Sequence, residues 1–444
     1  MTARLPRSAL LVVPVLATAC GQLIGVDDVS FGAPVVAVCD ATQRSCEPNF
    51  VVETQNMFVY GRWEPYRAER IARAKAQIEA SEADVLCLTE FGAPNDRQQL
   101  RDGVAGAYPF SHFVHTDESS PVDVPETIDG NPPAPPGDPL CAGLDAQVDA
   151  GLDCLAAHCS TVPGSDLGLF TSDECATEFC QDTVLALKSR EERLCAQCIH
   201  AVMDDHSIAD ARRACSVPPG GMRLGYSGEN ATMLLSKHPL SRLASFVLPS
   251  TRSRQVVLRA TVDKPGLAPV DVYCTRFTSN NDGAFDYYEG PYGGDSTGLA
   301  AWDNESQLQA MRAAQWVLAA RPYRAIFMGW LAASREVMID GELWAQGYRP
   351  KTLEVFDAAF IDAVPATFPG CTACLANPLF DDTYVDRRTD HVFLLGLDKS
   401  NVVDVAITNT EPVVPVEPGP RSKGKAIVPI SDHYGLRVGL RVPG

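Results

Sequence analysis

Short apolar runs recur along the chain, and each of them ends in polar residues. The run from Asp84 to Thr89 shows almost no alternation of apolar and polar positions, and Val51 to Gln55 is a similar segment before it. A continuous apolar run of this length is typical of a strand buried on both faces. Further strands are predicted within the stretch Gly228 to Leu240, which runs into a turn, and at Val256 to Val262, Val270 to Thr275, Ala325 to Met328, Thr389 to Phe393 and Val438 to Val442.

Two amphipathic segments between these runs predict helices. One extends from Pro65 to Ala83, with Arg70 on its polar side, and the other from Asn304 to Ala320. Their expected inner faces are Ile71, Ala74 and Ile78 in the first helix, and Leu308, Met311, Ala314 and Leu318 in the second. Strands that recur with intervening helices predict an α/β fold of two packed sheets with helices outside.

Residues 116–222 differ in character and form a predicted insert. Eight cysteines fall between a Pro-rich entry and a Gly/Pro exit, at Cys141, Cys154, Cys159, Cys175, Cys180, Cys195, Cys198 and Cys215. Their spacing favours short helices joined by disulfides, although eight cysteines allow 105 pairings. A zinc site or redox pair at Cys195 and Cys198, with His200 nearby, is the alternative.

The first residues indicate export. Arg4 and Arg7 precede a short apolar stretch, so residues 1–19 are predicted to be a signal peptide. Cys20 follows small residues and resembles the lipidation cysteine of a bacterial lipoprotein, although Ala17 stands where Leu is usual. The alternative is ordinary cleavage after Ala19 without a lipid. Residues 20–48 are predicted to be a tether, in which Cys39 and Cys46 are close enough to bridge.

Composition narrows the possible partners. The chain has 444 residues, 45% of them apolar, and a formal net charge of −19. A surface that grips a phosphate backbone is normally basic, so the charge disfavours a nucleic-acid substrate and leaves small phosphoesters, lipid headgroups and protein partners open. Of fifteen cysteines, fourteen remain if Cys20 carries a lipid, and an even number permits full pairing in an oxidising compartment.

Several polar residues that end the apolar runs have the chemistry of a metal-assisted hydrolytic site. Asp432 and His433 lie together just before the last run, while Asn56, Glu90 and Asp390 lie at the ends of others. Carboxylates bind a divalent cation, and a carboxylate beside an imidazole fixes its tautomer and raises its basicity. Each residue alone also fits a local role, such as a turn cap for Asn56. Their common position at strand ends favours one shared site.

In this order the motifs resemble the endonuclease/exonuclease/phosphatase superfamily, metal-dependent phosphoesterases that include pancreatic deoxyribonuclease and bacterial sphingomyelinases. The resemblance covers residues 49–115 and 223–444 and implies a four-layer α/β/β/α sandwich of two mostly antiparallel sheets. It implies that Glu90, Asn56 and Asp432 bind Mg²⁺. It also implies that His433 is the catalytic imidazole and that Asp390 orients it.

The same comparison departs from the family at three positions. Arg276 stands where the family has a phosphate-contacting histidine, Trp330 where it has the aspartate that handles the nucleophilic water, and Ala332 where it has a phosphate-binding asparagine. An indole neither accepts a proton nor binds a cation through oxygen, whereas Arg276 is a fixed cation suited to a phosphate oxygen. We therefore expect a weakened Mg²⁺ site and impaired hydrolysis.

Two alternatives follow from the sequence. The protein is an active phosphodiesterase on small or lipid substrates if a substitute base, such as Asp295 or Asp303, replaces the missing carboxylate. It is instead an extracellular interaction module if the cysteine-rich insert forms its functional surface. A Cys371–Cys374 loop bridge is expected before the Asp390 strand.

Overall fold

The computed structural model describes the strands and helices of the predicted sandwich and a small part of the insert. The described residues are 35–37, 47–59, 66–91, 94–114, 141, 143–159, 179–180, 192, 195, 230–251, 254–278, 288, 292–339, 341–380, 386–419 and 422–444. The predicted signal peptide, Cys20, the possible Cys39–Cys46 bridge and most of the insert lie outside them. No helix in the described part is long and apolar enough to cross a membrane.

One sheet has seven strands in the order β1-β14-β17-β2-β3-β5-β4. Its members are β1 (Val35–Ala37), β14 (Val402–Thr408), β17 (Gly435–Leu440), β2 (Phe50–Asn56), β3 (Val85–Thr89), β5 (Met233–Ser236) and β4 (Phe110–His112). Strands β2 and β3 are parallel, and the other pairs are antiparallel.

The second sheet has six strands in the order β12-β13-β9-β8-β7-β6. They are β12 (Ile361–Asp362), β13 (Asp390–Leu395), β9 (Ala325–Trp330), β8 (Val270–Arg276), β7 (Gln255–Val262) and β6 (Leu240–Leu248). Only β8 and β9 are parallel. Two small hairpins are β10 (Val337–Ile339) with β11 (Glu342–Ala345), and β15 (Val414–Pro415) with β16 (Ile427–Val428).

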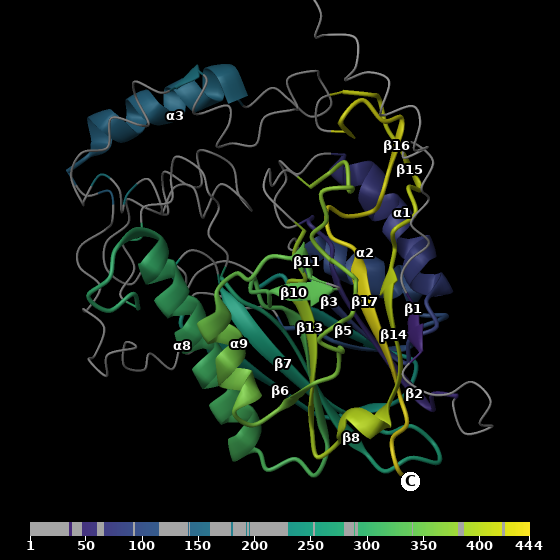
Figure 1. The fold of residues 1–444 in the computed structure, drawn as a ribbon. Coiled ribbons are helices and arrows are strands. Elements are labelled where there is room, and N and C mark those ends of the chain that lie inside the picture. Colours follow the sequence, from purple (N-terminus) through teal and green to yellow (C-terminus); the bar gives the residue numbers. More distant parts are fainter. Residues whose placement is uncertain are drawn as a thin grey trace, which may run out of the picture.

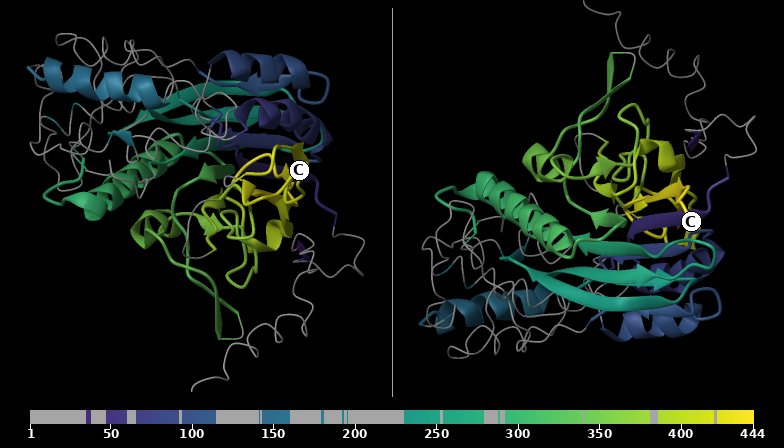
Figure 2. Two further views of the ribbon diagram at one scale, coloured as in Figure 1. Left: turned by 90° about the horizontal axis from the view of Figure 1, so that it is seen from above. Right: turned by 90° about the horizontal axis from the view of Figure 1, so that it is seen from below.

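The two sheets pack face to face, with helices on both outer sides (Figures 1 and 2). Val52 and Val85 from one sheet and Val272 and Ile326 from the other share the central core. Helices α1 (Arg67–Ala80) and α2 (Pro94–Val104) cover the seven-stranded sheet, and α8 (Gly298–Ala319) and α9 (Pro350–Asp357) cover the six-stranded sheet. The predicted four-layer sandwich is therefore confirmed. Outside these layers lie α3 (Asp145–Cys159) and the short helix η2 (Lys399–Asn401).

Three details differ from the sequence predictions. Val35–Ala37, within the predicted tether, pair with β14 as an edge strand. Arg70 was expected on the polar side of α1 but is fully buried, because its guanidinium meets backbone carbonyls of distant loops. Leu318 was expected to face inward but is 43% exposed, because Ala313 and Val317 are the residues of this part of α8 that pack on the sheet.

Four disulfides are present among the described residues. Cys371–Cys374 is the predicted loop bridge and is confirmed. Cys141–Cys195 and Cys154–Cys180 lie in the insert, so Cys195 forms a structural disulfide with Cys141 and no pair with Cys198. Cys87–Cys274 joins β3 to β8 across the central core, and both residues are fully buried. It was not predicted, because its two cysteines lie 187 residues apart in the sequence.

Candidate active site

The predicted site residues meet at one edge of the sandwich. Asn56 ends β2 and Glu90 follows β3, its parallel neighbour. Asp390 begins β13, which is antiparallel to β9, and Asp432 and His433 precede β17, which is antiparallel to β2. Parallel strands end at the same edge, and an antiparallel neighbour begins there. The alternation of strand directions therefore brings segments from the whole chain to one place.

His433 and Asp390 form an imidazole–carboxylate pair. His433 Nδ1 lies 3.4 Å from Asp390 Oδ2, and both side chains are buried. Burial by itself disfavours the charged imidazole, but Asp432 and the other site carboxylates outweigh it and raise the pKa of His433 to about 9. Burial raises the pKa of Asp390, with the hydrogen bond to His433 acting against it. The pair has the arrangement in which a carboxylate orients an imidazole.

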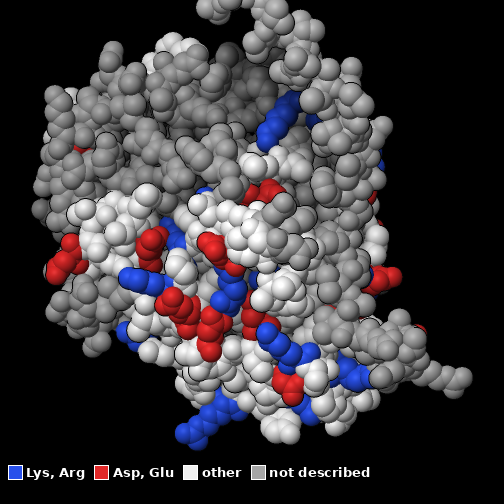
Figure 3. Space-filling view, viewed as in Figure 1, with Lys and Arg blue, Asp and Glu red and all other residues white. Residues whose placement is uncertain are grey.

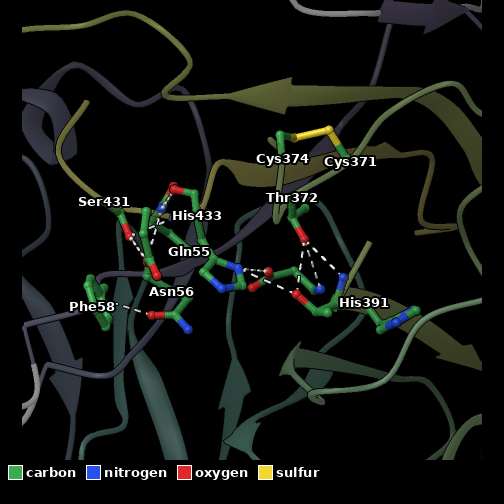
Figure 4. Close-up of polar contacts among 12 residues, drawn as sticks. Gln55, Asn56, Phe58, Cys371, Thr372, Cys374, His391, Ser431 and His433 are labelled. Atoms are coloured by element: carbon green, nitrogen blue, oxygen red, sulfur yellow. Dashed lines mark hydrogen bonds and ion pairs between the residues drawn. A yellow bond between two sulfur atoms is a disulfide. The ribbon is translucent and has the colours of Figure 1, made fainter. Parts of the chain in front are cut away.

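A loop closed by the Cys371–Cys374 bridge holds this pair in place (Figure 4). Thr372 Oγ1 accepts hydrogen bonds from the backbone N–H groups of Thr389, at 3.0 Å, and Asp390, at 3.2 Å. The Thr372 carbonyl accepts from Tyr434 N at 2.8 Å. One threonine thus connects the strand of Asp390 to the segment of His433, a role that its position between two cysteines did not reveal.

Two further positioning residues were also missed. The Gln55 side chain donates to the His433 carbonyl at 2.8 Å from beside Asn56 (Figure 4). Arg70 donates to the carbonyls of Met57, at 2.5 Å, and Ile430, at 2.7 Å. Arg70 therefore joins the loop after β2 to the loop before β17. Alternation along the predicted strand could have indicated Gln55, but nothing in the sequence distinguished Arg70 from the other arginines of its helix.

Arg276 contacts a predicted metal ligand. Arg276 Nη2 lies 3.4 Å from Glu90 Oε1, and both side chains are largely buried. The Arg276 guanidinium also lies 5.6 Å from the centre of the Trp330 ring, within the range of a cation–π interaction. Glu90 has a φ of 55°, a strained conformation for a residue other than glycine and one often found at functional sites.

The predicted Mg²⁺ ligands do not form a good metal site in this arrangement. Glu90 is engaged by Arg276, and Asn56 Oδ1 accepts a hydrogen bond from Phe58 N at 2.9 Å. Burial raises the pKa of Asp432 to about 6, against the opposing effect of His433. Within the described ranges no group of three His, Cys, Asp or Glu side chains is placed to hold a metal ion. The Arg276 guanidinium, a fixed positive charge 3.4 Å from the Glu90 carboxylate, therefore weakens this donor set for a divalent cation.

Trp330 lies inside the site. Its ring is edge-on to that of His433, with the centroids 5.7 Å apart. Gly329 fixes the strand register, because a Cβ at this position would come within 1.9 Å of the Thr275 carbonyl oxygen of β8. Ala332, where the family has an asparagine, is buried with a φ of 47°, a conformation that asparagine tolerates better than alanine.

The structure describes both of the suggested substitute bases. Asp303 pairs with Arg349 at 3.0 Å, and Asp295 is exposed. His391, the neighbour of Asp390, points away from the pair and contacts the Ala333 carbonyl at 2.8 Å (Figure 4). On the face shown in Figure 3, acidic and basic side chains are interspersed.

The fold and the site define an α/β sandwich with an imidazole–carboxylate pair at one edge. Among solved structures, a sphingomyelinase C from Streptomyces griseocarneus is 13% identical, covers 88% of this chain and 99% of its own, and has a TM-score of 0.47. A beta toxin from Staphylococcus aureus with bound magnesium ions is 12% identical, with coverages of 88% and 99% and a TM-score of 0.48.

An endonuclease/exonuclease/phosphatase from Beutenbergia cavernae is 15% identical, covers 89% of this chain and 72% of its own, and has a TM-score of 0.41. These neighbours are of the superfamily that the sequence motifs resemble. No family model matches the chain, and no curated protein matches it.

Proposed function

We propose that this protein has a phosphodiesterase-type site in which hydrolysis is severely impaired. The observation that carries the proposal is the position of Trp330, which faces His433 from the end of β9. In the family that the sequence motifs resemble, the carboxylate that handles the attacking water stands at this position. An indole has one N–H donor and no acceptor, so it cannot take the proton of that water.

The size of the effect follows from the groups replaced. Loss of a general base costs about 100- to 10,000-fold in rate. Loss of one donor to the developing charge, as at Ala332, costs about 100- to 1000-fold. These effects are not additive, but either one alone leaves only a small fraction of the turnover rate. The His433–Asp390 pair is retained, so the site keeps a proton-transfer pair without its partner groups.

Hydrolysis of bis-p-nitrophenyl phosphate with Mg²⁺ tests the proposal. We expect no turnover above the protein-free rate for the unaltered chain. The triple variant Trp330→Asp, Ala332→Asn, Arg276→His should gain activity by about 100-fold or more, since it regains a base and a donor. Adding His433→Ala to this variant should remove the gain. Mg²⁺-dependent turnover by the unaltered protein that His433→Ala abolishes would overturn the proposal.

The ancestral substrate class is a small or lipid phosphodiester, in keeping with the net charge of −19. We also propose that the protein is exported and anchored through a lipid on Cys20. The disulfides of the described chain support an oxidising compartment. Membrane fractionation of the unaltered protein and of Cys20→Ser tests the anchor, which is excluded if both variants fractionate alike.

A further inference from the structure

The Glu90 carboxylate contacts the guanidinium of Arg276 in the same chain. Glu90 follows β3 in the seven-stranded sheet, and Arg276 ends β8 in the six-stranded sheet. Their contact, at 3.4 Å between Oε1 and Nη2, bridges the two sheets at the edge where the site lies. The two side chains are only 11% and 8% exposed, so solvent screens this pair little.

Arg276 is also held on a second side. In the parallel pairing of β8 with β9, Arg276 stands beside Trp330, whose ring centre is 5.6 Å from the guanidinium carbon. The negative face of an indole attracts a cation, and the attraction strengthens where water is excluded. A guanidinium does not lose its proton in proteins, so it is a permanent positive charge at this place.

We propose that the Arg276 guanidinium is the resident cation of this site, where it neutralises Glu90 and excludes a divalent metal ion. A metal bound by Glu90 would face the fixed charge of Arg276 at close range, and like charges repel strongly where the dielectric is low. The Asn56 side chain does not offset this repulsion, because its oxygen, which also accepts from Phe58 N, carries no net charge.

The replacements at Arg276 and Trp330 thus act together, since one supplies the charge and the other supplies the ring that holds it. The inference rests on the proposed function in taking this edge of the sandwich as the former phosphodiesterase site.

Titration of the purified full chain with MnCl2, followed by electron paramagnetic resonance of free Mn²⁺, tests the proposal. Glu90→Gln distinguishes this site from weak binding elsewhere on an acidic protein. We expect identical isotherms for the unaltered chain and Glu90→Gln. Arg276→Ala should bind one further Mn²⁺ at least about tenfold more tightly than the unaltered chain, because the opposing charge is gone. This added binding should disappear in Arg276→Ala/Glu90→Gln.

Arg276→Lys is the matched control, since it keeps the positive charge and should add no metal binding. A site in the unaltered chain that Glu90→Gln removes would overturn the proposal, and this comparison does not depend on any arginine variant folding. Folded Arg276→Ala without added binding would overturn it too. If the unaltered chain binds metal through Glu90 but does not hydrolyse the substrate, only the exclusion of metal by Arg276 is refuted. If it hydrolyses the substrate through His433 without metal, only the proposed impairment of hydrolysis is refuted.

Discussion

Asp390 and Trp330 are directly opposite each other in the antiparallel pair of β13 and β9. Residues paired in this way project to the same face of a sheet. Asp390 contacts His433 Nδ1, and the Trp330 ring approaches the same imidazole from another side. Strand pairing therefore sets the face of the sheet from which Trp330 projects, and a one-residue change of register would move it to the other face.

Gly329→Ala should disrupt this register. An added Cβ would lie 1.9 Å from the Thr275 carbonyl oxygen, and the φ of 147° is unfavourable for alanine. We expect a loss of about 3 kcal/mol or more in the free energy of unfolding, measured by urea denaturation. Gly106→Ala is the control, because nothing lies within 4 Å of its added Cβ, and it should change stability by less than about 1 kcal/mol. Equal effects of the two substitutions would contradict the close approach of β8 and β9.

Arg70→Ala should destabilise the protein far more than Arg73→Ala on the same helix. Arg70 is fully buried and donates to the carbonyls of Met57, Phe58 and Ile430, whereas Arg73 is exposed. Loss of charged donors to buried carbonyls predicts a decrease of about 3 kcal/mol in the free energy of unfolding. Urea midpoints of the two variants provide the comparison, and similar midpoints would argue against the role of Arg70 in joining the two loops.

Removal of the Cys87–Cys274 disulfide should cost more than removal of Cys371–Cys374. The first pair is separated by 187 residues in sequence and the second by 3, and a cross-link that closes a longer loop restricts the unfolded chain more. The double alanine variant of the first pair should lose about 4 kcal/mol or more. Denaturation without reductant measures both variants. A larger loss of unfolding free energy on removal of Cys371–Cys374 would show that restriction of the unfolded chain is not the main effect of these disulfides.

His391 should contribute a pH dependence of stability in weakly acidic solution. Burial lowers the pKa of His391 to about 4, from an ordinary value of about 6.5. The unfolded chain therefore binds more protons at this group between these values, so stability falls as the pH decreases from about 6.5 toward 4. The full contribution is about 3 kcal/mol. In urea unfolding between pH 7 and pH 4.5, His391→Gln should show a smaller decrease than the unaltered protein, and parallel curves would refute a buried neutral His391.

The sandwich was predictable because strands buried on both faces have continuous apolar sequences. In β3, Val85 and Cys87 face the central core, while Leu86 and Leu88 face the helices α1 and α2. Strand ends then indicated where polar residues gather, and Glu90, Asp390, Asp432 and His433 do meet there. The roles assigned to them in catalysis and metal binding remain predictions.

Other features depend on contacts between distant segments, which local patterns do not contain. The helical pattern of the sequence predicts that a charged residue such as Arg70 is exposed. Its burial is favourable because carbonyls of two distant loops accept its hydrogen bonds. The family resemblance implied that Arg276 stands where the family has a histidine, but the contact of Arg276 with Glu90 requires the two sheets to be stacked. The edge strand Val35–Ala37 is too short to show a period of its own.

The Cys87–Cys274 bridge limits how this molecule can open. It connects the middle layers three residues before Glu90 and two before Arg276, measured along the respective strands. While that covalent link persists, the two sheets cannot separate by a hinge motion at this edge. Anything that enters between Glu90 and His433 must therefore do so without a hinge opening of the two sheets.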